Sequence, residues 1–161
     1  MTIFTVSGKN GIVSSMNKVI EKKIKIAAPV TGVWQAITEA GLMAKWMGGP
    51  ELRLEVDTTW ETGTPITIKG FHHIRFENKG TVLEYVPYQA ISYDFLSSLS
   101  RLPDTKENYT VIRFSIAREE DQTLLTLLIT NFPTETIYQH LNFYWNTTIV
   151  LLKKCIEQPY N

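Results

Sequence analysis

The chain has 161 residues, in which sixteen Lys and Arg balance sixteen Asp and Glu. A net charge of zero argues against a nucleic-acid binder, because such proteins neutralise phosphates with a cationic surface, and against a polybasic membrane-surface module. A content of 43% hydrophobic and 20% charged residues is that of a single globular domain with one continuous core.

The ends of the sequence and its cysteine content bear on location. No stretch reaches the roughly 20 apolar residues that span a bilayer, and residues 1–15 lack the continuous apolar region of a signal peptide. The lone cysteine, Cys155, permits no internal disulfide. These features predict a cytoplasmic protein, with residues 1–18 as a peripheral arm and 19–158 as the domain.

The first predicted elements are a strand and two short helices. From Val19 onward, Ile20, Ile24 and Ile26 alternate with charged residues, which indicates a half-buried strand. Pro29 suits the first turn of a helix that continues to Gly41. A second helical turn is expected at Met43–Met47.

After Pro50 the hydrophobic period changes from 3.6 to 2. Six further strands are predicted, at Glu51–Val56, Pro65–His73, Gly80–Val86, Ala90–Leu96, Tyr109–Ala117 and Thr123–Thr130. The short connections have turn composition, so an antiparallel meander is expected. The exception is the polar segment Ser97–Asn108, which we interpret as a lip or lid over a site.

The last predicted element is a long helix that begins with a capping box of Thr136 and Gln139 and ends at Pro159. Its apolar stripe consists of Leu141, Trp145, Ile149, Leu152 and Ile156. An antiparallel sheet with one apolar face must be covered, and this is the one long helix predicted. We therefore expect an α+β fold, a curved seven-stranded antiparallel sheet around the C-terminal helix, with a cavity between them.

Four stretches carry a resemblance to a known family. Residues 28–38 have the sequence APVTGVWQAIT, residues 42–48 LMAKWMG, residues 80–87 GTVLEYVP and residues 145–153 WNTTIVLLK. In order and spacing they resemble the START-like superfamily (SRPBCC, which includes the birch-pollen-allergen fold). Within it they are similar to the subgroup named for the activator of heat-shock protein 90 ATPase, C-terminal domain type. The resemblance covers residues 19–157.

The resemblance implies a helix-grip fold with two short helices after strand 1. Superfamily members bind hydrophobic small molecules such as lipids, sterols, plant hormones or polyketides, and some are cyclases or hydroxylase subunits. The co-chaperone that names the subgroup, a stress-response protein, uses this domain together with a separate N-terminal domain. Only about eighteen residues precede the fold here, so we expect no second domain of that kind.

The candidate ligand-binding residues are aromatic and apolar side chains assigned to the inner face. Strand alternation places Leu83 and Tyr85 on one face, and likewise Tyr93 and Phe95. Buried tyrosines are singled out because their hydroxyls need partners, which suits a cavity that holds water or a polar-headed ligand. The predicted set is Trp46, Tyr85, Tyr93, Phe95, Phe114, Tyr138, Leu141 and Trp145. Trp60, like Trp46, lies near an element end where it would gate the cavity.

Metal and cofactor sites are not expected. His72 and His73 are adjacent in a strand and therefore point to opposite faces unless a bulge intervenes. His140 is distant on a helix, and no Cys or carboxylate cluster has zinc-type spacing. Gly48-Gly49 precedes a proline and a strand, so it lacks the geometry of a phosphate loop. No cofactor is implied.

Nucleophilic and acid–base roles also lack support. Cys155 is expected to be a small, half-buried thiol, and no serine lies in a nucleophile elbow. Arg113 and Glu84 are assigned by alternation to the outer face, where charges are solvated. An inward orientation of either residue would make it an acid–base or anion-anchoring candidate.

Three functions are compatible with these features. The leading hypothesis is the binding of a small hydrophobic or amphipathic molecule between helix and sheet. The first alternative is an interaction module, a chaperone regulator that contacts a protein partner or a second copy. The second is a cyclase- or hydrolase-type enzyme. A hollow interior lined by the tyrosines favours the first, and a filled interior with an exposed apolar patch favours the interaction module.

Overall fold

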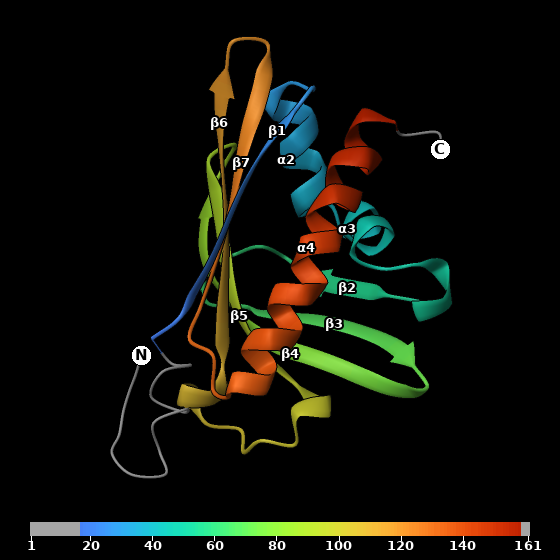
Figure 1. The fold of residues 1–161 in the computed structure, drawn as a ribbon, viewed down its shortest axis with the longest axis vertical. Coiled ribbons are helices and arrows are strands. Elements are labelled where there is room, and N and C mark those ends of the chain that lie inside the picture. Colours follow the sequence, from blue (N-terminus) through green and yellow to red (C-terminus); the bar gives the residue numbers. More distant parts are fainter. Residues whose placement is uncertain (1–16, 159–161) are drawn as a thin grey trace.

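The computed structural model describes residues 17–158, which form a seven-stranded antiparallel sheet and a long C-terminal helix (Figure 1). The strands are β1 (Val19–Ile26), β2 (Glu55–Thr58), β3 (Pro65–His72), β4 (Ile74–Val86), β5 (Ala90–Ser97), β6 (Thr110–Glu119) and β7 (Gln122–Thr130). The helices are α2 (Val30–Thr38), α3 (Ala40–Met47) and α4 (Glu135–Glu157), with single 3₁₀ turns η1 (Pro50–Leu52), η2 (Ser98–Ser100) and η3 (Lys106–Asn108). The α+β helix-grip prediction is thereby confirmed.

The sheet has the order β1-β7-β6-β5-β4-β3-β2, so the first strand pairs with the last. Ile20 lies opposite Ile129 and Ile24 opposite Leu125, which continues the apolar inner face across β1 and β7. Lys22 lies on this same inner face, opposite Leu127. Its ammonium leaves the apolar surface by donating hydrogen bonds to Asn142 and Asn146 of α4.

The two short helices close one end of the sheet. Glu39 between them has an extended backbone, which separates α2 from α3. The indole N–H of Trp46 in α3 donates to the main-chain carbonyl of Ala36 in α2 at 2.9 Å. This bond satisfies the polar end of a fully buried side chain and fixes α3 against α2.

The predicted boundaries of β2 and β4 were wrong. Residues Glu51 and Leu52 belong to η1, and β2 begins only at Glu55. Strand β4 begins at Ile74 rather than Gly80, because residues 74–79, which lie between the two predicted strands, pair with β3. The chain reverses instead at His73, whose left-handed backbone (φ 64°) lets the two histidine rings lie 4.7 Å apart. The expectation that these rings point to opposite faces was therefore wrong.

A bulge in β4 also corrects one predicted face. Val82 pairs with Tyr93, but Glu84 pairs with Ser92, so Leu83 is an extra residue on β4. Val82 is fully buried and Leu83 is exposed. The prediction that Leu83 and Tyr85 share a face by simple alternation was wrong, because a bulge breaks the period of two.

Close approach of two strands explains one glycine. A Cβ at Gly80 would lie 1.7 Å from the main-chain oxygen of Asp94, so no larger residue fits there. The Asp94 carboxylate accepts a hydrogen bond from the Thr81 main-chain N–H at 2.8 Å. At this close approach of β4 and β5, Asp94 therefore joins the two strands by a hydrogen bond between its side chain and the backbone of β4.

The long helix α4 is fixed at both ends. Thr134, not Thr136, is its N-cap, and its hydroxyl accepts from the Ile137 N–H at 3.1 Å, so the predicted capping box was wrong by two residues. Near the C-terminal end the Glu157 carboxylate accepts from the Ala27 N–H at 2.6 Å. The predicted stop at Pro159 and the arm up to Met16 lie outside the described residues.

The segment between β5 and β6 is held to the sheet by polar contacts. Asp104 forms an ion pair with Lys79 at 2.6 Å and accepts from the Tyr109 hydroxyl at 2.7 Å. The side chain of Asn131 donates to the main-chain oxygens of Glu107 and Tyr109. The interpretation of the segment Ser97–Asn108 as a lid stays a prediction.

Substitution of Trp145 tests how α4 is held. Trp145 is buried beneath the middle of α4, so Trp145→Ala is expected to lower the free energy of unfolding by about 3–5 kcal/mol. Urea denaturation measures the change. His140→Ala, which removes an exposed ring from the same helix, is the matched control and is expected to stay within about 0.5 kcal/mol of wild type. Equal stability of both variants would contradict the packing of α4.

Candidate functional site

Three aromatic rings fill the centre of the space between α4 and the sheet. Trp145 of α4 lies 5.9 Å from Phe114 of β6 and 6.0 Å from Trp46 of α3, and Trp46 and Phe114 are 6.2 Å apart. All three side chains are buried, with tilted or edge-to-face geometry. These predicted site residues lie together, and their mutual contacts are those of a packed core.

A second group of rings runs from the interior to the surface. Trp60 lies 6.0 Å from Tyr93 and 6.4 Å from Tyr85. Trp34 in turn lies 5.6 Å from Tyr85 and 5.8 Å from Tyr88, which stands in the β4–β5 turn with a left-handed backbone. Tyr93 is 3% exposed, Tyr85 37% and Tyr88 53%. The aromatic array therefore connects the inner face to solvent.

The inner face contains polar atoms without protein partners. The Tyr93 hydroxyl forms no hydrogen bond within residues 17–158, and burial, together with the nearby Tyr144, raises the pKa of its phenol well above the usual value. Among the unexposed residues that the structure describes, Asn78 Oδ1 is the one side-chain oxygen or nitrogen sealed from solvent without a partner. The Tyr93 side chain is almost fully buried, so its hydroxyl lies in apolar surroundings without a partner among the described residues.

Tyr144 of α4 completes this polar region. Its hydroxyl donates to the main-chain oxygen of Met47, which ties α4 to the end of α3. Burial raises the pKa of Tyr144, while a contact with the Thr148 hydroxyl acts in the opposite direction. Sequence reasoning missed Tyr144 because it precedes Trp145 and lies off the apolar stripe. Its position next to a stripe residue was the available signal.

The remaining predicted residues are distributed around this region. Phe95 and Leu141 contribute to the core. Tyr138 packs edge-to-face on Phe132 at 5.1 Å, and the Lys18 ammonium lies over its ring. Tyr138 therefore has ring partners different from those of Tyr85 and Tyr93, so the structure does not place the three predicted tyrosines in one ring of contacts.

Arg113 and Glu84 lie on the outer face, as predicted. Two hydrogen bonds join them, at 2.8 and 3.3 Å, and both side chains remain partly exposed. The hydrogen bond from Arg113 holds the pKa of Glu84 below its usual value. This pair has the geometry of a surface ion pair rather than of an inward acid–base group.

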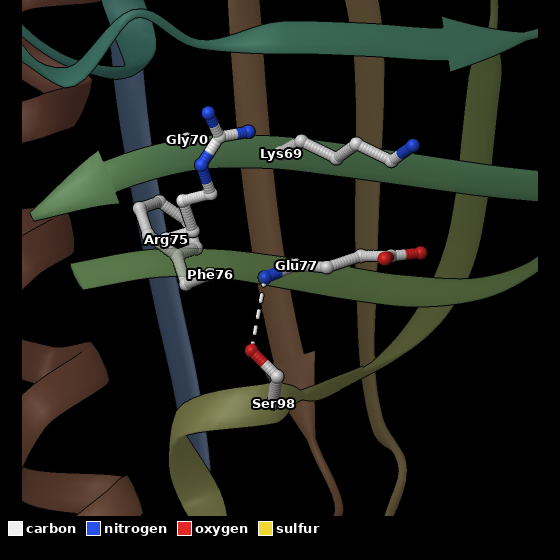
Figure 2. Close-up of a pocket in the computed structure, with 6 residues that line it drawn as sticks. All are labelled: Lys69, Gly70, Arg75, Phe76, Glu77 and Ser98. Carbon is white, nitrogen blue, oxygen red and sulfur yellow. Dashed lines mark hydrogen bonds between the residues drawn. The ribbon is translucent and has the colours of Figure 1, made fainter.

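Two surface depressions lie away from α4. One, of about 390 Å³, is lined by Lys69, Gly70, Arg75, Phe76, Glu77 and Ser98. Figure 2 shows Lys69 extended along β3 and Glu77 along β4, with Arg75 crossing from β4 toward Gly70 and the Ser98 hydroxyl accepting from the Glu77 N–H. The other, of about 280 Å³, shares Glu77 and Ser98 and extends to Lys79 and Asp104. Neither depression is lined by a candidate residue named from the sequence.

No group of three or more His, Cys, Asp or Glu in residues 17–158 is arranged to hold a metal ion. Cys155 is partly buried with a free thiol. In the part of the chain that the structure describes, no helix is long and apolar enough to cross a bilayer.

Comparison with protein families decides the relationship of the chain. Residues 27–157 match the sequence pattern of the family described as "Activator of Hsp90 ATPase homolog 1-like protein". The chain belongs to this family. No curated protein matches the sequence.

Solved structures share the START-like fold. A solution structure from Cytophaga hutchinsonii is 28% identical, with a TM-score of 0.74, and the match covers 89% of this chain and 97% of that one. The solution structure of the Aha1 dimer from Colwellia psychrerythraea is 21% identical, with a TM-score of 0.69, over 89% and 99% of the two chains. DynU16, from the dynemicin biosynthetic locus, is 16% identical, with a TM-score of 0.70, over 89% and 48%. The family and fold named from the sequence are thereby confirmed.

The outer ion pair gives a pH-dependent prediction. Because the pKa of Glu84 is lowered in the folded state, the pair stabilises the fold above the unfolded pKa, and this contribution is lost as the pH falls through the folded value. A double-mutant cycle of Glu84→Gln and Arg113→Met is expected to give about 0.2–1 kcal/mol of coupling at pH 7 and none in strong acid. Urea denaturation at both pH values measures it. Coupling that persists in acid would contradict the ion pair.

The two interior tyrosines are expected to respond differently to loss of the hydroxyl. Tyr144→Phe removes the hydrogen bond to Met47 and should cost about 0.5–1.5 kcal/mol of stability. Tyr93→Phe removes a hydroxyl without a partner among the described residues, so its thermal melting temperature should equal or exceed that of wild type. A clear drop for Tyr93→Phe would show that this hydroxyl is bonded within the protein.

Proposed function

We propose that this protein binds a small amphipathic ligand between α4 and the inner face of β4 and β5. The observation that supports the proposal is the Tyr93 hydroxyl, which stands in apolar surroundings without a partner in residues 17–158. An unpaired polar group in such surroundings costs about 1–3 kcal/mol. A hydroxyl or carbonyl of the ligand, next to Tyr93 and Tyr144, would recover this free energy.

The apolar part of the ligand would lie against side chains of the core cluster that contains Tyr93. Leu141 and Phe95 belong to the core or border it, and Trp145 and Phe114 close the far side. Burial of apolar ligand surface contributes roughly 25 cal/mol per Å², so shape would supply most of the affinity. In this scheme Trp46 supports Trp145 from behind.

The ligand would enter along the aromatic array. Tyr85 lies between buried Trp60 and the surface ring of Tyr88, with Trp34 beside it. Rotation of Tyr85, which is more than a third exposed, would open a path to Tyr93 without breaking a strand. Tyr138 lies near the opposite end of the sheet, where we propose that it supports the N-terminal turn of α4.

The alternative is a chaperone-regulating interaction module, which the family description suggests. It is supported by exposed apolar side chains in the last residues of β4 and in the β4–β5 connection, namely Leu83, Val86 and Tyr88. For either function we propose a cytoplasmic location and, as the domain, residues 19–158. The packed centre around Trp145 favours the interaction module. The Tyr93 hydroxyl, which a purely surface function leaves unexplained, favours ligand binding.

A matched pair of probes tests ligand binding. Naphthalene and 1-naphthol differ by one hydroxyl, and both should quench tryptophan fluorescence on binding, because Trp145 and Trp60 border the proposed site. Tyr93→Phe is expected to weaken 1-naphthol binding about 2- to 10-fold, the value of one neutral hydrogen bond, and to leave naphthalene unchanged. Native mass spectrometry of protein purified from its own host would identify a co-purifying molecule.

Tyr109→Phe is the control, since the Tyr109 hydroxyl bonds Asp104 on the surface. This variant should bind both probes like wild type. Equal binding of 1-naphthol to wild type and Tyr93→Phe would remove Tyr93 from the site. Failure of both probes to bind, together with no co-purifying molecule, would overturn the proposal and favour the interaction module.

A further inference from the structure

The outward side of α4 has an unusual composition. From Thr136 to Leu152 the helix contains no Asp, Glu, Lys or Arg, although one residue in five of the whole chain is charged. Burial explains only the inward side. On the outward side Phe143 is 77% exposed, Val150 50% and Leu151 41%. Solvent-facing helix surfaces normally contain charged residues.

These residues form one continuous stripe. Helical spacing aligns His140, Phe143, Thr147 and Val150 along the axis, with Leu151 beside them. All five are exposed. In Figure 1 α4 runs in front of the sheet along most of its length. We call these five residues the α4 stripe. A neutral apolar centre that includes an aromatic ring is typical of the core of a protein interface.

The charges of α4 lie beyond the two ends of the stripe, with Glu135 at the start and Lys153, Lys154 and Glu157 at the end. Glu135 begins the helix, where it pairs with Lys18. Lys153 forms an ion pair with Glu157 of the same helix, whereas Lys154 is exposed on the same side as the stripe. A parallel partner helix of the same sequence would place like charges together. An antiparallel copy places acid against base at both ends.

We propose that the α4 stripe is a self-association surface, on which α4 of a second copy of this chain packs antiparallel around a two-fold axis. Two-fold packing centred between Phe143 and Thr147 puts Phe143 against the partner's Thr147 and His140 against the partner's Val150. The same register sets Lys154 against the first turn of the partner helix, next to the partner's Glu135. A two-fold axis brings each surface against its own copy, so the absence of charge near the axis is what such a contact requires.

Sedimentation velocity over about a hundredfold range of concentration tests the proposal, with circular dichroism as a check on folding. Wild type should pass from monomer to dimer as concentration rises. Phe143→Glu places two carboxylates near the axis and is expected to raise the dimer Kd by at least about 30-fold, the effect of losing a central contact. Glu120→Gln, a charge change in the β6–β7 turn away from α4, is the control and should leave Kd unchanged.

A charge exchange tests the antiparallel orientation. Lys154→Glu and Glu135→Lys should each weaken the dimer, and the double variant should recover a substantial part of the loss. Additive loss in the double variant would overturn the antiparallel register. A dimer that Phe143→Glu leaves intact would overturn the surface. A monomer at every concentration would overturn self-association and would leave another protein, or residues 1–16, as the candidate cover.

Discussion

The packing of Trp145 against Trp46 and Phe114 is the contact on which the rest of the structure depends. These rings come from α4, α3 and β6, so one contact joins the long helix, the helix pair and the sheet. Aromatic side chains also set how far α4 stands from the sheet. The backbone of α4 approaches the backbones of β1, α2 and α3 more closely than those of the central strands β5 and β6. The large side chains on β5 and β6 therefore occupy, or border, the intervening space.

The contrast between inner and outer polar groups gives the site its chemical character. On the outer face Arg113 satisfies Glu84, and Lys79 satisfies Asp104, in contacts that solvent screens. On the inner face Lys22 and Tyr144 find partners on neighbouring elements, but Asn78 Oδ1 and the Tyr93 hydroxyl find none among the described residues. Unsatisfied groups in an apolar region are expected at sites that a ligand or an ordered water completes.

Sequence periodicity was enough to predict the order of elements and the inner face of β1, β6 and β7, because β6 and β7 alternate without interruption and β1 departs only at Lys22. It failed where the backbone leaves the regular period. The bulge at Leu83 and the left-handed residue His73 each change which side chains face together, and neither contains the glycine that usually marks such a position. The packing of Tyr138 on Phe132 was also inaccessible to sequence reasoning, since it depends on how the connection before α4 folds back.

The two sides of α4 can be altered independently, and this separates the two proposals. Trp145 and Tyr144 face the protein interior, whereas Phe143 and Val150 face outward. Consecutive residues of one helix thus belong to the packed interior and to the exposed stripe. Thr134 and Glu157 anchor the two ends of the helix, so the position of the helix does not depend on its outward side chains. A substitution on the outward side is therefore expected to leave Trp145 in place. A charge at position 143 is accordingly expected to weaken the proposed association and to leave the contacts of Trp145 and Tyr144 unchanged.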